Sequence, residues 1–376
     1  MTATPQQQAN QGRRVDGARD GGQLFADYAA RVRPHLETAL RGYLDGVERA
    51  NRHLPQDVQA SVETVRDLSL RGGKRLRAVL LAAGYEASGG PGGPDAVVMA
   101  GVSLELLQTY LLIHDDWMDA DDVRRGGPSV PAMLRKQFEG RGAGGRTADA
   151  FTILAGDFAA GLALDALGQV EVPPARLAQA FREMGRIQRD VVLGQMCDLA
   201  GEVSAEPPTE AAVELTHTLK TGSYTVRGPL ALGASLAGAD AATWKALEAF
   251  AQPLGVAFQL RDDVLGTFGD PSQTGKPSTG DLRQGKRTGL IAALTTGSSP
   301  ATAALLGKAF GKPDAKTEDV EALVDHIVTS GAKRRVDERI ESLLAQAMAA
   351  LEAAPLTTEA RALLAGAAHT LGRREK

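Results

Sequence analysis

Apolar residues recur about every fourth position near the start of the chain. From residue 24 onward this spacing is kept by Leu24, Tyr28, Val32, Leu36, Leu40 and Leu44. Such spacing places the side chains on one face of an α-helix. Ala- and Leu-rich stretches with helical spacing follow at 75–87, 97–119, 150–168, 174–200, 210–221, 241–265 and 333–353. The pattern predicts a chain that is helical nearly throughout from residue 23.

Gly- and Pro-rich segments separate these stretches. They are SGGPGGP at 88–94, GRGAGG at 140–145, EPP at 206–208 and the long stretch 266–288. Because no alternating apolar and polar run lies between turn residues, strands are not needed to explain the pattern. We therefore expect one all-α domain over 23–376, a single large bundle of ten or more helices. Residues 1–22 have few apolar anchors and are predicted to be a disordered tail.

Composition and charge exclude several other classes of protein. The 376 residues include 42 Lys and Arg against 46 Asp and Glu, a net charge of −4. A nucleic-acid binder normally carries a strong basic excess, so we expect no nucleic-acid partner. A single cysteine, Cys197, excludes an internal disulfide or a multi-cysteine metal site. We find no stretch approaching the ~18–20 apolar residues of a transmembrane segment and no apolar leader, so we expect a cytoplasmic protein.

The sharpest chemical feature is HDDWMDADDVRRGGPSVP at 114–131. Asp115 and Asp119 are four residues apart, which places their carboxylates on one helical face. Five acids within eight residues at a helix C-terminus repel one another and oppose the helix dipole, so a positive partner must compensate. Magnesium suits such a cluster because it takes one or two carboxylates together with phosphate oxygens. The alternative is an acidic, solvated surface, but Arg124 and Arg125 follow at once, and guanidinium groups suit phosphate.

A second acidic pair and two further basic clusters accompany this motif. Gln259, Asp262 and Asp263 share a helical face, and the loop beyond them carries Lys276, Arg283, Lys286 and Arg287. The segment RGGKRLR at 71–77 places Lys74 and Arg77 on one face. Two separated acidic pairs, each followed by basic residues, describe a site that clamps diphosphates through metal ions.

These motifs resemble the trans-isoprenyl diphosphate synthases, the polyprenyl synthetase family. The resemblance rests, in order, on GGKRLR, ELLQTYLLIHDDWMDADDVRRGGPS, ILAGD at 153–157, GQMCD at 194–198, KTGSY at 220–224, FQLRDD and TGKPSTGDLRQGK. It is closest to the short-chain type and to bacterial geranylgeranyl diphosphate synthases. The resemblance implies a prenyltransferase with a helical-bundle fold, usually a homodimer, that condenses isopentenyl diphosphate with an allylic diphosphate.

The resemblance also implies a role for each site residue. Magnesium ions, three per active site, would be held by Asp115 and Asp119 with Asp116 supporting them, and by Asp262 and Asp263. The allylic diphosphate would contact Arg124, Lys220, Lys276 and Lys286. The diphosphate of isopentenyl diphosphate would contact Lys74, Arg77 and Arg125, with Gln108 as a polar neighbour. Lys220, Thr221 and Gln259 are the predicted catalytic residues, the last two lining the path of the developing cation.

Chain length is predicted to depend on the helix that leads to the first aspartates. Tyr110 and Leu111 precede Asp115 by five and four residues, and five residues of helix span ~7.5 Å. In the family the growing chain descends along this helix, so a bulky Tyr110 would act as a floor. We favour geranylgeranyl diphosphate as product, with farnesyl diphosphate next. The alternative is that Tyr110 is an ordinary core residue.

One motif departs from the family pattern. The second aspartate motif usually reads DDxxD, but here it reads DDVLG, with Gly266 at the third position. Asp270 and Asp281 lie further along, and the sequence assigns neither of them as a substitute.

Two rival functions are a class I terpene cyclase and a non-catalytic partner subunit of a heteromeric synthase. A second diphosphate site disfavours the cyclase, and the intact first motif disfavours the partner subunit.

Overall fold

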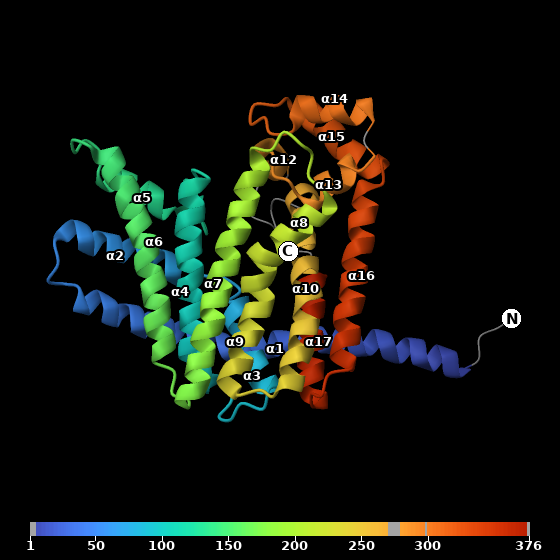
Figure 1. Cartoon of the computed structure of the whole chain (residues 1–376), viewed down its shortest axis with the longest axis horizontal. Helices are drawn as coiled ribbons and strands as arrows, with labels where there is room; N and C mark the ends of the chain where they lie inside the picture. Colours follow the sequence, from blue (N-terminus) through green and yellow to red (C-terminus); the bar gives the residue numbers. More distant parts are fainter. Residues whose placement is uncertain (1–4, 270–278, 298, 374–376) are drawn as a thin grey trace. The chain divides into compact units, whose positions relative to one another are not determined.

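The computed structural model describes residues 5–269, 279–297 and 299–373, with side chains from residue 22. The described chain divides into two compact units. Unit 1 comprises Met1–Ala26, Glu183–Ala231 and Asp240–Lys376, and unit 2 comprises Asp27–Arg182 and Leu232–Ala239. Most described residues of both units are helical (Figure 1). The predicted all-α class is therefore confirmed.

Most elements of unit 2 surround the helix that carries the first aspartate motif. In chain order they are α1 (Pro5–Ala50), α2 (Gln56–Leu70), α3 (Leu76–Ala87), η1 (Pro94–Val97), α4 (Val98–Met118), β1 (Val123–Arg124), β2 (Gly127–Pro128), α5 (Val130–Gln137), α6 (Gly144–Gly168) and α7 (Pro174–Glu202). The boundary between the units falls within α1, α7 and α9 (Gly228–Ala237). Helix α4 packs against α3 and α6.

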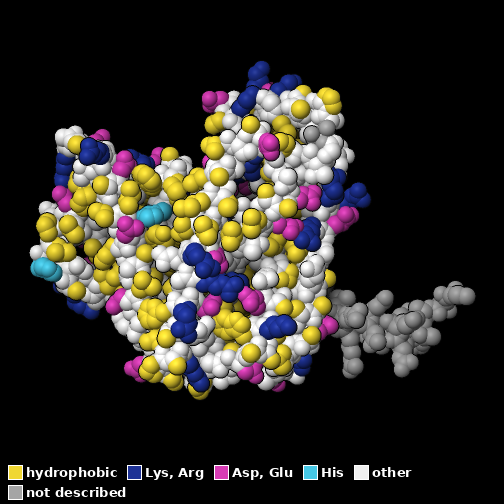
Figure 2. Space-filling model, in the orientation of Figure 1, with side chains coloured by type: hydrophobic (Ala, Val, Ile, Leu, Met, Phe, Trp, Pro, Cys, Tyr) yellow, Lys and Arg dark blue, Asp and Glu magenta, His cyan; other side chains and the backbone are white. Residues whose placement is uncertain are grey.

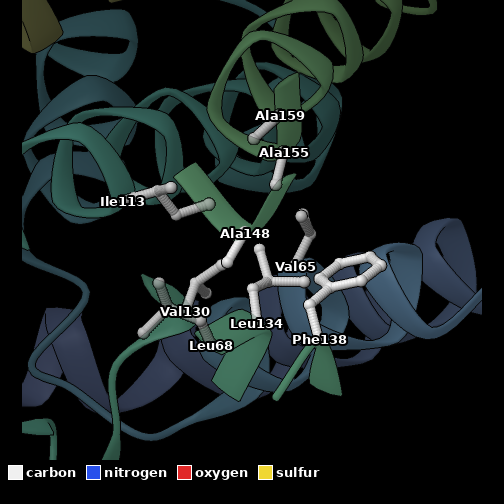
Figure 3. Close-up of a cluster of buried hydrophobic side chains, with 9 residues drawn as sticks. All are labelled: Val65, Leu68, Ile113, Val130, Leu134, Phe138, Ala148, Ala155 and Ala159. Carbon is white, nitrogen blue, oxygen red and sulfur yellow. The ribbon is translucent and has the colours of Figure 1, made fainter. Parts of the chain in front are cut away.

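Small side chains on α6 let this helix lie close to its neighbours. Ala148, Ala155 and Ala159 recur at helical spacing and are almost fully buried. Larger apolar residues of the other helices meet them, and Figure 3 shows the cluster of Val65, Leu68, Ile113, Val130, Leu134, Phe138 and these three alanines. Burying such side chains stabilises the fold by about 25 cal/mol per Å² of apolar surface. The cluster fixes α4 between α2, α5 and α6.

A short hairpin follows α4, although the sequence pattern needs no strands to explain it. Val123 pairs with Pro128 and Arg124 with Gly127 in an antiparallel register. The two residues between the strands, Arg125 and Gly126, have φ of 50° and 72°. Positive φ at both central positions is typical of a type I′ turn, the tightest hairpin connection. Strands of two residues are too short to leave an alternating pattern, so the sequence reading missed them.

Unit 1 is built around α10 (Ala241–Phe268), which lies beside α16 (Ala332–Glu352) (Figure 1). Its other elements are α8 (Glu210–His217), η2 (Thr218–Arg227), α12 (Gly280–Gln284), α13 (Gly289–Thr295), α14 (Pro300–Ala309), α15 (Thr317–Thr329) and α17 (Thr358–Gly372). Segment η2 is a π-helix, a form that is rare and frequent at functional sites. It approaches α10 so closely that a Cβ at Gly255 would lie 2.6 Å from the Cα of Gly222.

Three expectations from the sequence bear on the limits of the fold. The single domain over 23–376 and the disordered tail at 1–22 both stay predictions. Of the tail, residues 1–4 lie outside the described part, and residues 5–21 have described backbone alone. The expectation that no stretch is long and apolar enough to span a membrane is wrong by length and composition. Pro94–Met118 and Gly144–Gly168 both pass that test, with 61% and 39% of their apolar windows buried. Core helices rich in Ala, Leu and Gly share this composition.

The surface carries mixed charge. Figure 2 shows basic and acidic side chains next to one another at several places on the face it displays. This distribution agrees with the small net charge of −4.

A buried ion pair ties the segment 71–75 to α4. Arg75 and Glu105 have side chains that are 2% and 1% exposed, and Arg75 Nη1 donates to Glu105 Oε2 at 2.6 Å. Arg75 also donates to the carbonyl of Ser69 at 3.1 Å. Charges buried this deeply are costly when one partner is removed, because the other then lies uncompensated in a low-dielectric interior.

We therefore expect Glu105→Leu to lower the free energy of unfolding by about 3–5 kcal/mol. The double variant Arg75→Met/Glu105→Leu removes both charges and should recover a large part of this loss. Urea denaturation followed by circular dichroism measures both. Equal destabilisation in the single and double variants would show that the pair contributes through packing rather than charge.

Candidate functional site

The first aspartate motif ends α4, as the sequence predicts. Asp119 is the C-cap residue, and its backbone N–H donates to the carbonyl of Asp115 at 2.8 Å. Asp115 and Asp119 are therefore one helical turn apart on one face. The side chain of Asp115 is 28% exposed and Asp119 is exposed, whereas Asp116 is fully buried. Solvent reaches the first and last carboxylates of the motif and not the middle one.

Arg124 compensates the charge of this acidic cluster. Its Nε donates to Asp116 Oδ1 at 2.6 Å, and its Nη2 lies 3.2 Å from Asp121 Oδ2 and 3.6 Å from Asp115 Oδ2. The hairpin carries Arg124 back over the end of α4. The positive partner that the sequence requires is thus supplied at least in part by the chain itself.

Asp116 differs electrostatically from the other acids of the motif. Burial raises its pKa to about 6, against the opposing effect of the hydrogen bond and charge of Arg124. Its Oδ2 is buried and makes no hydrogen bond within the described part of the chain. Asp116 therefore holds Arg124, while Asp115 and Asp119 present the accessible oxygens.

A second polar cluster of unit 2 joins three of the predicted substrate-binding residues. In the amide orientation that satisfies its neighbours, the oxygen of Gln108 accepts hydrogen bonds from Arg125 at 3.0 Å and Arg77 at 3.1 Å. Arg125 Nη1 also donates to the carbonyl of Arg71 at 3.2 Å. Two guanidinium groups held at one amide form a concentrated positive site. Lys74, three residues before Arg77 in the sequence, is exposed.

Arg71 is a positioning residue that the sequence reading did not single out. Its Nη1 donates to the carbonyls of Arg124 at 2.9 Å and Pro128 at 2.7 Å, one on each hairpin strand. A Cβ at Gly127 would lie 2.9 Å from the Arg71 guanidinium carbon, so glycine there permits the approach. Arg71 therefore ties the RGGKRLR segment to the hairpin that carries Arg124 and Arg125. The available signal was an extra arginine in front of GGKRLR.

The predicted chain-length residues lie on α4 one turn or more before the aspartates. Tyr110 is half-buried, packs against the cluster of Figure 3 and makes an edge-to-face contact with His114, the ring centroids being 4.9 Å apart. His114 in turn lies 3.1 Å from the carbonyl of Ile153 on α6. Leu111 is also half-buried. The ring of Tyr110 is therefore braced by His114 of its own helix and by the core cluster.

In unit 1 the structure brings together the predicted catalytic residues Thr221 and Gln259. Thr221 Oγ1 donates to Gln259 Oε1 at 2.7 Å, across the close contact between η2 and α10. Lys220, the preceding residue, donates to Asp198 of the GQMCD motif at 2.6 Å and is 32% exposed. Three motifs that are far apart in the sequence thus meet at the π-helix.

The two aspartates of the second motif have different surroundings. Asp263 is 5% exposed and accepts hydrogen bonds from Gln259 Nε2 at 3.1 Å and from the backbone N–H of Gly289 at 2.9 Å. The buried His217, which the sequence reading also missed, lies 3.3 Å from it. Asp262 is half-buried. These contacts give Asp263 a positioning role, which leaves Asp262 as the more accessible carboxylate.

The two remaining predicted phosphate ligands follow α10. Lys286 is 40% exposed and lies 3.9 Å from Asp281 Oδ1. Lys276 lies outside the described residues. The first aspartate motif belongs to unit 2, and the second belongs to unit 1.

The donors of both motifs fit a hard divalent cation. Asp115 and Asp119 offer accessible carboxylate oxygens, the ligand type that magnesium prefers. Among the described residues, no group of three His, Cys, Asp or Glu side chains converges to hold a metal by itself. Magnesium characteristically uses one or two carboxylates and completes its shell with phosphate oxygens and water, so such sparse donors suit a site shared with a diphosphate.

Comparison with known proteins agrees with this geometry. The Polyprenyl synthetase family model matches residues 59–327. A geranylgeranyl diphosphate synthase of Mycobacterium tuberculosis is 36% identical over 283 residues, which are 73% of this chain and 74% of that protein. A (2E,6E)-farnesyl diphosphate synthase of the same species is 32% identical over 265 residues, which are 70% of this chain and 68% of that protein.

A solved structure extends the likeness to nearly the whole chain. The geranylgeranyl pyrophosphate synthase of Corynebacterium glutamicum, complexed with isoprenyl diphosphate and magnesium, superposes with a TM-score of 0.83. The identity is 32%, and the match covers 93% of this chain and 99% of that one. With the ordered motifs, the helical fold and the matched family model in agreement, the chain belongs to the polyprenyl synthetase family of prenyltransferases.

Proposed function

We propose that the protein is a magnesium-dependent short-chain prenyl diphosphate synthase that condenses isopentenyl diphosphate with an allylic diphosphate. The observation that carries this proposal is the pair of polar clusters in unit 2. One is the acidic end of α4 with Arg124, and the other joins Arg77 and Arg125 at Gln108. An enzyme that condenses two diphosphates needs two such sites, whereas a cyclase needs one.

The acidic cluster would bind the allylic diphosphate. Asp115 and Asp119 would hold magnesium, and Asp262 would do so from the second motif. The bound ion would stabilise negative charge on the departing diphosphate. Arg124 is fixed by Asp116 and adds a guanidinium that can stabilise the same charge without reorganising. The count of three ions per active site remains part of this proposal.

The basic cluster would bind isopentenyl diphosphate. Arg77 and Arg125 are already oriented by Gln108, so little conformational freedom is lost when they contact a diphosphate. Lys74 adds a flexible positive charge beside them. Attack by the double bond of the bound isopentenyl group on the ionised allylic carbon forms the new bond. The released diphosphate would then take the proton, so no protein nucleophile is required.

Unit 1 would contribute the residues near the developing cation. The hydrogen bond from Thr221 fixes the Gln259 oxygen, which offers a dipole without being a nucleophile. Lys220 would contact the allylic diphosphate, together with Lys276 and Lys286. An apolar wall is needed around the cation because water would quench it.

The product is proposed to be geranylgeranyl diphosphate, with farnesyl diphosphate as the second candidate. Curated relatives of similar identity carry both names, so identity alone does not decide between them. The half-buried Tyr110 favours a short product because its ring is braced by His114 and by the core cluster. We also propose that the protein acts in the cytoplasm.

A homodimer is proposed from the exposed side of α6. Helix α6 is among the most apolar of the described helices, yet some of its apolar side chains are exposed. They are Ile153 at 38%, Leu154 at 61% and Leu164 at 43%. A contiguous exposed apolar patch is typical of a protein interface, and we propose that these side chains form part of one. Sedimentation at micromolar concentration should give a dimer, and Leu154→Glu should shift it towards monomer. A fully active monomeric wild type would contradict this assignment.

We expect Asp115→Ala or Asp119→Ala to lower turnover at least about a hundredfold. Both changes remove an accessible carboxylate from a crowded helix end, so the free energy of unfolding should stay unchanged or rise slightly. The assay incubates the pure chain with magnesium, isopentenyl diphosphate and an allylic primer and analyses the products by mass spectrometry.

Asp122→Ala is the matched control, because Asp122 belongs to the same acidic run but is 75% exposed and pairs with Arg135. It should keep near-wild-type turnover. Full activity of Asp115→Ala at saturating magnesium would remove the metal-ligand assignment. The wild-type products also separate the rivals, because a cyclised hydrocarbon indicates a terpene cyclase and no product indicates a partner subunit.

Tyr110→Ala should lengthen the product by at least one isoprene unit while leaving the first condensation almost unchanged. The physical reason is loss of the ring that would block the growing chain about five helical residues, ~7.5 Å, from Asp115. Product length by mass spectrometry is the readout. Tyr110→Phe keeps the ring and should keep the wild-type length, whereas an unchanged product from folded, active Tyr110→Ala would place the floor elsewhere.

A further inference from the structure

The position left without a carboxylate in the second aspartate motif is filled from another segment. Gly266 stands one helical turn after Asp262 on α10, where the family motif has its third aspartate. A Cβ at Gly266 would overlap Oδ2 of Asp281. The carboxylate of Asp281 therefore occupies the space into which a side chain at position 266 would project. Residues four apart share a helical face, so this carboxylate lies on the Asp262 face of α10.

The segment that carries Asp281 is docked onto the end of α10. The backbone N–H of Thr279 donates to the carbonyl of Gly266 at 3.3 Å. Leu282, the next residue after Asp281, is 1% exposed, and its carbonyl accepts from the N–H of Gly311 at 2.9 Å. Asp281 itself is 23% exposed. A buried neighbour and two backbone hydrogen bonds hold the carboxylate in place while leaving its oxygens accessible.

The glycine at position 266 makes this arrangement possible. Glycine within a helix is unfavourable relative to alanine because it loses more backbone entropy on folding. Any larger residue would push the Asp281 carboxylate away from α10. Gly266 and Asp281 thus form a matched pair, in which α10 has no side chain at position 266 and Asp281 of α12 supplies the acid.

We infer that Asp281 supplies the third carboxylate of the second aspartate motif and, with Asp262, forms its divalent-cation site. This inference rests on the proposed function. Asp263 faces another direction and is already bound by Gln259 and Gly289, so it serves the site by positioning. Lys286, 3.9 Å from Asp281, would contact a phosphate oxygen of the same ligand.

The inference is tested by cation binding in the full-length chain, without turnover. Asp115→Asn and Asp119→Asn together silence the first motif, and the free Mn²⁺ signal in electron paramagnetic resonance then reports binding at the second motif with inorganic pyrophosphate. In this background, Asp281→Asn should weaken Mn²⁺ binding about tenfold. Gly266→Ala should weaken it similarly, because its Cβ displaces Asp281 without supplying an acid. Circular dichroism establishes that each variant is folded.

A carboxylate exchange gives the decisive comparison. Gly266→Asp combined with Asp281→Ala moves the acid from α12 to α10 and clears the space that the Asp281 side chain occupies, so Mn²⁺ affinity should return to within about threefold of the background. Gly266→Asp alone should bring no gain, since the new acid competes with Asp281 for one space. Asp314→Asn, a change of an exposed acid on the loop after α14, is the matched control and should have no effect.

Three results would overturn the inference. They are equal Mn²⁺ binding by the Asp281→Asn and Asp314→Asn variants, a carboxylate exchange that binds no better than Asp281→Asn, and a background protein that binds no Mn²⁺. Product formation by the wild type is assayed in parallel. If product forms but binding fails the pattern, this inference alone is wrong. If binding follows the pattern but no product forms, the proposed function is wrong and the carboxylate pair stands.

Discussion

Five carboxylates crowd the end of α4, where mutual repulsion and the negative end of the helix dipole both oppose them. One guanidinium relieves this constraint: Arg124 reaches Asp115, Asp116 and Asp121. Because Arg124 lies on a two-residue strand, the hairpin must close tightly, with Arg125 in the left-handed region. That turn also aims Arg125 at Gln108. Charge compensation at α4 and formation of the second polar cluster thus depend on one hairpin.

The segment RGGKRLR shows how one residue type serves different purposes. Arg71 binds the hairpin carbonyls, Arg75 is buried against Glu105, and Arg77 reaches Gln108. Arg75 stands between α2 and α3 with a φ of 51°, in the left-handed region, and the three arginines have different surroundings. One arginine stabilises the core, one positions the hairpin, and one joins the polar cluster at Gln108 that we propose binds isopentenyl diphosphate.

Burial separates positioning acids from accessible acids in both motifs. Asp116 and Asp263 are the buried members, and each is bound by neighbouring donors. Asp115 and Asp262 are only partly buried. A desolvated carboxylate gains most from fixed hydrogen bonds, whereas a cation that arrives with water and phosphate needs accessible oxygens. In each motif, one of the two consecutive aspartates is therefore held by neighbouring donors, and the other keeps more accessible oxygens.

The sequence by itself determined the helical class, the placement of Asp115 and Asp119 on one face, and the family. Helical spacing and sequence motifs involve residues that are close in sequence, so the sequence alone is enough to recognise them. Tertiary structure alone decided that Arg75 turns inward, that Arg71 and His217 support the sites, and that the carboxylate of Asp281 fills the space at Gly266. These contacts depend on which segments pack together in the folded chain. The spacing of residues along the sequence does not predict the distances between such segments.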